Sequence, residues 1–170
     1  MAKRDGNVAK GAPPPDCSGK RFAIVAARFY EQLSEWLEDG ARRALAECGV
    51  RAEDVTVYHV PGCFELPLAA KRIIAADDRI DAVVALGVVI RGETPHFDYV
   101  AGECARGIMN VQLATGVPIG FGVLTTESLE QAEERAHPER GDKGYDAAIA
   151  AATLLHVPRE PAREALGFRR

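Results

Sequence analysis

An uncharged run rich in β-branched residues, Val83 to Ile90, constrains the fold more than any other part of the chain. Such a run is typical of a central strand that is buried on both faces of a parallel sheet. It gives way abruptly to residues 91–98, which read Arg-Gly-Glu-Thr-Pro-His-Phe-Asp. Ligands of open parallel sheets bind in the crevice beyond the carboxyl ends of the strands. We therefore expect a cation, a hydroxyl and an imidazole to form a site there for an anionic substrate that exchanges protons.

The rest of the chain alternates between segments typical of strands and segments typical of helices. Short apolar segments predict strands at residues 21–27, 55–60, 83–90 and 118–124. Apolar residues at helical spacing predict helices at residues 31–48, 64–76, 97–115, 127–136 and 145–156. Strands separated by helices form right-handed βαβ units around a parallel sheet. We therefore predict an α/β fold of the three-layer α/β/α, flavodoxin-like type, with a four-stranded parallel sheet.

Composition argues against several kinds of partner. With 170 residues, 47% apolar and 27% charged, the chain is most simply one soluble domain. The net charge is −4 at pH 7 and both ends are basic, so an acidic middle disfavours nucleic acid. No apolar run is long enough to cross a membrane, and we expect no signal peptide because residues 1–20 have no hydrophobic stretch.

The cysteines and the two ends of the chain give further expectations. The four cysteines contain no Cys-x-x-Cys pair, which argues against a bound metal or a redox dithiol and favours a reducing cytoplasm. Residues 1–20 include Gly-Ala-Pro-Pro-Pro, and we expect a flexible N-terminal arm there. Residues 21–157 then form the folded domain, and residues 158–170 form a basic C-terminal tail.

Residues that follow the other strands should reach the same edge of the sheet. Phe29 follows the first strand, and residues 61–65 (Pro-Gly-Cys-Phe-Glu) follow the second. Alone, Phe29 is best explained as an aromatic that covers the core, and Glu65 as a complement to a helix dipole. His96 is the stronger candidate, because it stands at a strand-to-helix junction beside backbone N–H groups that suit an anion. Its imidazole can also exchange protons near neutral pH.

Two cations are ambiguous. Arg135 ends a predicted helix, where a cation complements the dipole, but Ala132 and Gln131 before it offer no ion pair. Structural and functional interpretations of Arg135 are evenly balanced, and Lys143 is equally open. Motifs typical of ATP hydrolysis, nicotinamide redox, serine hydrolase and zinc protease chemistry do not occur in the sequence.

Five stretches together resemble the 6,7-dimethyl-8-ribityllumazine synthase family. They are residues 27–29, 60–67, 85–100, 121–125 and 130–136, the last leading to Lys143 and Gly144, in the family's order, within a resemblance that runs from roughly residue 20 to 157. The block at residues 91–100 is long and specific. The resemblance implies a transferase of riboflavin biosynthesis that needs no metal or cofactor. Such an enzyme condenses 5-amino-6-(D-ribitylamino)uracil with 3,4-dihydroxy-2-butanone 4-phosphate and releases phosphate and water.

The resemblance also implies a role for each matching residue. His96 would shuttle protons during imine formation, phosphate elimination and ring closure. Glu93, Thr94 and Arg135 would bind the phosphate, for which a guanidinium fork is well suited. Phe29 would stack on the pyrimidine ring. The other substrate contacts would come from Cys63, Phe64, Glu65, the backbone of Val88, Val89 and Ile90, Lys143, and Phe121, which would reach a substrate bound mainly by a neighbouring subunit.

The resemblance further implies how the protein assembles and where it departs from the family. It implies a homopentamer with active sites between adjacent subunits, and it leaves open a shell of pentamers and riboflavin synthase as a partner. Tyr30 replaces the usual Asn, which puts a hydrogen bond to the ribityl chain in doubt. The turn at residues 137–142 is less glycine-rich than usual, so we expect a stiffer loop on the phosphate side.

A non-catalytic flavin- or lumazine-binding protein, or a purely structural shell, is the main alternative. Such a protein keeps Phe29 but has no need of His96 together with Arg135. Apart from the resemblance, a flavodoxin-like electron carrier is the fallback, weakened by the lack of a hydroxyl-rich phosphate loop after the first strand. The central expectation is that His96 and Arg135 face one pocket, walled in part by a second protomer.

Overall fold

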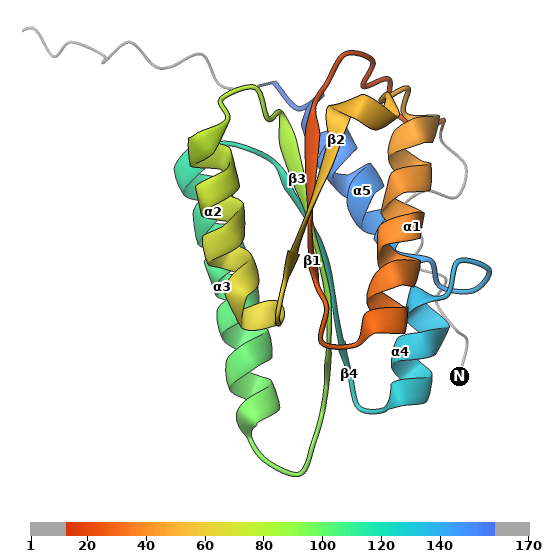
Figure 1. Cartoon of the computed structure of the whole chain (residues 1–170), viewed down its shortest axis with the longest axis vertical. Helices are drawn as coiled ribbons and strands as arrows, with labels where there is room; N and C mark the ends of the chain where they lie inside the picture. Colours follow the sequence, from red (N-terminus) through yellow and green to blue (C-terminus); the bar gives the residue numbers. More distant parts are fainter. Residues whose placement is uncertain (1–12, 159–170) are drawn as a thin grey trace, which may run out of the picture.

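The computed structural model describes residues 13–158, in which a parallel sheet lies between two layers of helices (Figure 1). All four strands pair in parallel in the order β2-β1-β3-β4. Their bounds are Phe22–Ala27 for β1, Val55–Val60 for β2, Ala82–Ile90 for β3 and Ile119–Thr126 for β4. The predicted fold class is therefore confirmed, although β4 continues two residues beyond the predicted strand.

Helices cover both faces of this sheet (Figure 1). One face carries α2 (Leu66–Ala76) and α3 (His96–Thr115). The opposite face carries α1 (Glu31–Glu47), α4 (Leu129–Ala136) and α5 (Lys143–Leu154). Short 3-10 turns precede β2 and α2, namely η1 (Ala52–Asp54) and η2 (Cys63–Glu65). The predicted second helix therefore begins as a 3-10 turn, and Pro67 stands in the first turn of α2, where its missing N–H is tolerated.

The central strand β3 owes its unbroken apolar sequence to helices on both of its faces. Residues 82–89 are all buried. Val84 and Leu86 pack into the core beneath α1 and α5, whereas Val83 and Ala85 pack into the core beneath α2 and α3. Because neither face meets water, the strand shows no alternation of apolar and polar residues.

The strand order creates a topological switch point between β1 and β3. The helices that follow β1 and β3, namely α1 and α3, lie on opposite faces of the sheet, so the loops after β1 and β3 diverge there. The pairing of β1 with β3 ends at Ala26 and Leu86, whereas β3 continues beside β4 up to Ile90. The last residues of β3 therefore have one backbone edge that does not pair with β1, and this edge faces the space beyond the end of β1.

Cys17 is an exception to the expectation that residues 1–20 stay outside the core. Its side chain is 1% exposed and joins the cluster beneath α1 and α5, and its N–H donates to the Cys48 carbonyl oxygen at 2.7 Å. The rest of the expected arm, up to residue 12, and the tail from residue 159 lie outside the described residues. Between residues 13 and 158, no helix has both the length and the apolar character to cross a membrane.

Candidate active site

A cleft of about 530 Å³ opens at the switch point, a volume that suits a small molecule. Its walls come from the loops after β1 and β2, the end of β3 and the first turns of α3. Nine of the residues singled out from the sequence line this cleft: Phe29, Cys63, Phe64, Glu65, Val88, Val89, Ile90, Thr94 and His96. Four others do not line it: Glu93, Phe121, Arg135 and Lys143.

Aromatic side chains form the rim of the cleft and are largely exposed in a single chain. Phe29 is 75% exposed and Tyr99 is 69% exposed. The ring of Phe29 meets that of Tyr30 edge to face, with centroids 5.1 Å apart. Tyr99 was not expected from the sequence, although its position three residues after His96 places both on one face of α3. Exposed rings around a cleft suit a planar ligand that stacks between them.

The floor of the cleft is formed where Cys63 packs against β3. Its Sγ donates to the Val88 carbonyl oxygen at 3.6 Å. This close approach depends on Gly87, because a Cβ atom there would lie 2.5 Å from the sulfur. Burial raises the pKa of the Cys63 thiol to about 12. At neutral pH the thiol therefore stays protonated, so Cys63 serves as an apolar wall and a weak donor rather than as a nucleophile.

His96 is the one imidazole that lines the cleft among the described residues. It is the first residue of α3, following Thr94 and Pro95 in the exposed loop after β3. Within residues 13–158 its ring makes no hydrogen bond to another side chain or to the backbone, so both ring nitrogens are available to a bound ligand. The position suits a group that moves protons to and from a substrate in the cleft.

Arg91 is engaged with two carboxylates and does not line the cleft. Its guanidinium bonds Asp98 at 3.1 Å and Glu127 at 2.8 Å, and it lies 4.1 Å from the centroid of the Phe97 ring. The expectation that this cation faces a ligand is therefore not met in the single chain. Arg91 instead ties the end of β3 to the start of α3 and to the loop before α4, and so helps to shape the loop that carries Thr94.

Arg135 and Lys143 lie at the two ends of the loop between α4 and α5, on the face of the sheet opposite α3 (Figure 1). The Arg135 guanidinium donates to the Gln131 carbonyl oxygen at 2.9 Å, a backbone partner that the spacing of side chains did not indicate. Lys143 pairs with Asp146 at 2.6 Å. A single chain therefore does not place Arg135 in the cleft that holds His96.

The cleft also differs from a metal centre. Across residues 13–158, no group of three or more His, Cys, Asp or Glu side chains is arranged to hold a metal ion. The groups that the cleft does offer are aromatic rings, the open backbone edge of β3, one carboxylate and one imidazole. Together these groups can stack a heteroaromatic ring, bond its polar edge and exchange its protons.

The fold and the cleft define a flavodoxin-like α/β/α protein with a cleft of small-molecule size at the carboxyl edge of its sheet. The sequence model of the 6,7-dimethyl-8-ribityllumazine synthase family matches residues 19–159. A curated relative from Syntrophus aciditrophicus (strain SB), described as a 6,7-dimethyl-8-ribityllumazine synthase, is 50% identical over 142 residues, or 84% of this chain and 92% of the relative. The chain belongs to the 6,7-dimethyl-8-ribityllumazine synthase family.

Proposed function

We propose that this protein is the transferase that condenses 5-amino-6-(D-ribitylamino)uracil with 3,4-dihydroxy-2-butanone 4-phosphate in riboflavin biosynthesis. One observation supports the proposal most directly. The chain belongs to this family, and its cleft brings together aromatic rings that can stack a ligand, the backbone edge of β3 that lies beyond β1, and His96. A non-catalytic lumazine-binding protein also needs the platform, but it has no use for an imidazole whose two nitrogens are available. We place the protein in the cytoplasm, because all four cysteines are free thiols.

In this proposal the pyrimidine stacks on Phe29 while its polar edge bonds the backbone of residues 88–90. Those residues have no β1 partner in the described sheet, so apart from the Val88 carbonyl oxygen, which accepts from Cys63, their backbone groups on that side are open to the cleft. The substrate amine is then held next to the ketone, and orientation supplies most of the rate enhancement. His96 carries protons between the reacting atoms as water and phosphate leave.

We further propose that Phe121, Arg135 and Lys143 complete the cleft of an adjacent copy in a homopentamer. None of the three lines the cleft of its own chain. Phe121 on the edge strand β4 is 43% exposed and Leu113 on α3 is 74% exposed, and exposed apolar side chains of this size suit a subunit contact. The Arg135 guanidinium, at the end of α4, would bind the phosphate of the second substrate as a bidentate fork.

Mixing two impaired variants tests both the reaction and the shared site. His96→Ala and Arg135→Met subunits are each assayed alone, by the fluorescence of the lumazine product, and then after joint refolding in equal amounts. If each site takes its two halves from different copies, about one quarter of the sites in random pentamers combine two intact halves. We therefore expect mixed pentamers to recover activity well above that of either variant.

The outcomes separate the parts of the proposal. If the wild-type protein makes no lumazine from the two substrates, the enzyme assignment is wrong. Activity in the wild type without recovery in mixed pentamers means that one chain supplies both groups, which contradicts the shared site alone. Sedimentation of the same samples distinguishes a pentamer from a shell of pentamers, and copurification tests riboflavin synthase as a partner.

A further inference from the structure

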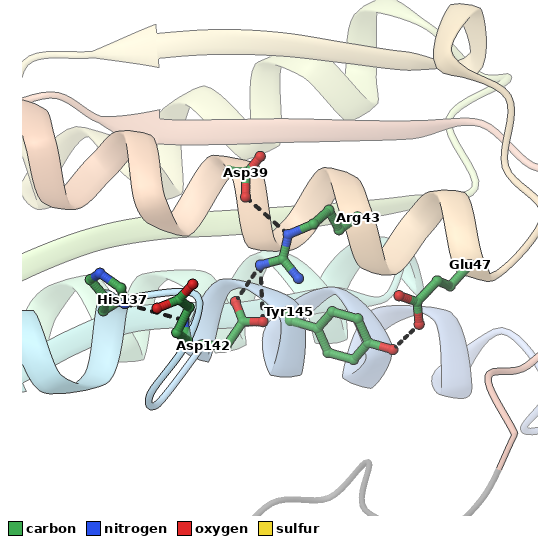
Figure 2. A network of polar contacts seen from close by, with 7 residues as sticks. Asp39, Arg43, Glu47, His137, Asp142 and Tyr145 are labelled. Carbon is green, nitrogen blue, oxygen red and sulfur yellow. Dashed lines mark hydrogen bonds and ion pairs between the residues drawn. The ribbon is translucent and has the colours of Figure 1, made fainter.

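The loop at residues 137–142 joins Arg135 to Lys143, and contacts from α1 hold it in place. Figure 2 shows Arg43 of α1 between Asp39 of its own helix and Asp142 of the loop. The Arg43 Nη2 lies 3.0 Å from each oxygen of the Asp142 carboxylate, and its Nε lies 2.9 Å from Asp39. The guanidinium therefore couples the surface of α1 to the start of α5.

Asp142 sits in a conformation that needs such support. It is the one described non-glycine residue with a positive φ, at 44°, a left-handed conformation that costs free energy for residues with a Cβ atom. Its side chain is 20% exposed, and burial raises the pKa of its carboxyl group even beside Arg43. Without Arg43, this half-buried carboxylate would lose the cation that compensates for its desolvation.

A second contact fixes the other end of the same loop. The His137 ring meets the Trp36 ring of α1 edge to face, with centroids 4.9 Å apart. Glycines at Gly40 and Gly144 let α1 and α5 approach closely, since a Cβ atom at either position would collide with the facing backbone or with Asp142. The loop is therefore held against α1 at both of its ends.

The loop in turn packs directly on the backbone of Arg135. A Cβ atom at Gly141 would lie 2.6 Å from the Arg135 Cα, and the Gly141 N–H donates to the Glu134 carbonyl oxygen at 2.9 Å. Movement of the loop would therefore shift the last turn of α4, from which the Arg135 side chain projects.

From these contacts we infer that Arg43 is a positioning residue for Arg135, acting through Asp142 and the loop that Asp142 anchors. The inference rests on the proposed role of Arg135 in binding the substrate phosphate. Arg43 itself does not line the cleft, and its Nε and Nη2 atoms bond the carboxylates of Asp39 and Asp142. Its loss should therefore weaken binding of the phosphate substrate and leave binding of the pyrimidine substrate unchanged.

Steady-state kinetics of the full-length Arg43→Met variant test this inference, with KM determined separately for each substrate. Arg42→Met is the matched control, because Arg42 is its neighbour on α1 and bonds only Glu38, at 3.1 Å, among the described residues. We expect Arg43→Met to raise KM for the butanone phosphate about tenfold, and to leave KM for the pyrimidine within about twofold. The same measurement on Arg135→Met and on the double variant shows whether the two residues act through one another.

We expect the double variant to have the same KM for the butanone phosphate as Arg135→Met alone. Three results would overturn the inference. Arg43→Met and Arg42→Met could give the same KM for the butanone phosphate, or Arg43→Met could raise KM for both substrates equally. The effects of Arg43→Met and Arg135→Met on that KM could also be fully additive in the double variant. If Arg135→Met itself leaves that KM unchanged, the proposed phosphate role of Arg135 fails instead. Asp142→Asn, which removes the charge but suits a left-handed residue, takes the place of Arg43→Met in the same assay should that variant not fold.

Discussion

Gly87 lies in β3 directly beneath the floor of the cleft, and alanine at this position introduces a collision of known size. The new Cβ atom would lie 2.5 Å from the Cys63 sulfur and 3.2 Å from the Ala27 Cβ. Nonbonded heavy atoms prefer a separation of about 3.5–4.0 Å, so the contact with sulfur is too short by about 1 Å. Either Cys63 or the strand must move.

The size of the effect follows from two opposing contributions. Overpacking of a buried site costs about 1–3 kcal/mol. Alanine in place of glycine stabilises by about 0.4–1 kcal/mol through the unfolded chain where the backbone can accept it. Gly87 has no positive φ, so this gain applies. We expect Gly87→Ala to lower the free energy of unfolding by about 1–2 kcal/mol.

The collision partner can be removed separately, which makes the prediction specific. Cys63→Ala deletes the sulfur and leaves space for the new methyl group, so the double variant should be destabilised less than the sum of the two single variants. Because Cys63 lines the cleft, Gly87→Ala should also raise KM for the pyrimidine substrate, and the second substitution should restore part of the loss.

Urea unfolding of the assembled protein measures these differences. Gly102→Ala is the control, since nothing lies within 4 Å of a Cβ atom at that position in α3, and it should stabilise the protein by about 1 kcal/mol. A Gly87→Ala variant as stable as the wild type, or a cost that Cys63→Ala does not relieve, would refute the described packing of the cleft floor.

Three further predictions follow from other parts of the chain. Burial raises the pKa of three thiols above the ordinary 9.0, to about 11, 12 and 11 for Cys48, Cys63 and Cys104. Above pH 9 the unfolded chain therefore loses thiol protons that the folded chain keeps. The free energy of unfolding should then fall from pH 9 toward pH 12. A thermal unfolding temperature that does not change over this pH range would contradict the prediction. Ser128→Ala should cost about 1 kcal/mol in urea unfolding, because the hydroxyl caps α4 at 3.3 Å, and Ser128→Asp should restore it. His96→Ala should slow turnover without abolishing it, and a variant with the wild-type rate would exclude the proton-transfer role.

Much of the fold and most of the cleft could be predicted from local sequence. The continuous apolar run of β3 requires cover on both faces, and the carboxyl-edge rule then brings together residues that are distant in the chain, such as Phe29, Cys63 and His96. Other features depend on tertiary contacts of loop residues, which local patterns do not encode. Cys17 is buried because it bonds the end of α1, and Arg91 is turned toward Asp98 and Glu127 rather than toward the cleft.

The separation of His96 from Arg135 has a simple physical origin. His96 begins α3 on one face of the sheet, whereas Arg135 lies in the last turn of α4 on the other face. Helix α4 leads away from the carboxyl edge, and the six residue steps from Leu129 to Arg135 span about 9 Å along its axis. Folding of one chain therefore leaves Arg135 off the cleft, and in the proposed pentamer a neighbouring copy would supply it. Catalysis and assembly should then be lost together, so dilution below the dissociation constant of the oligomer should abolish activity while each chain remains folded.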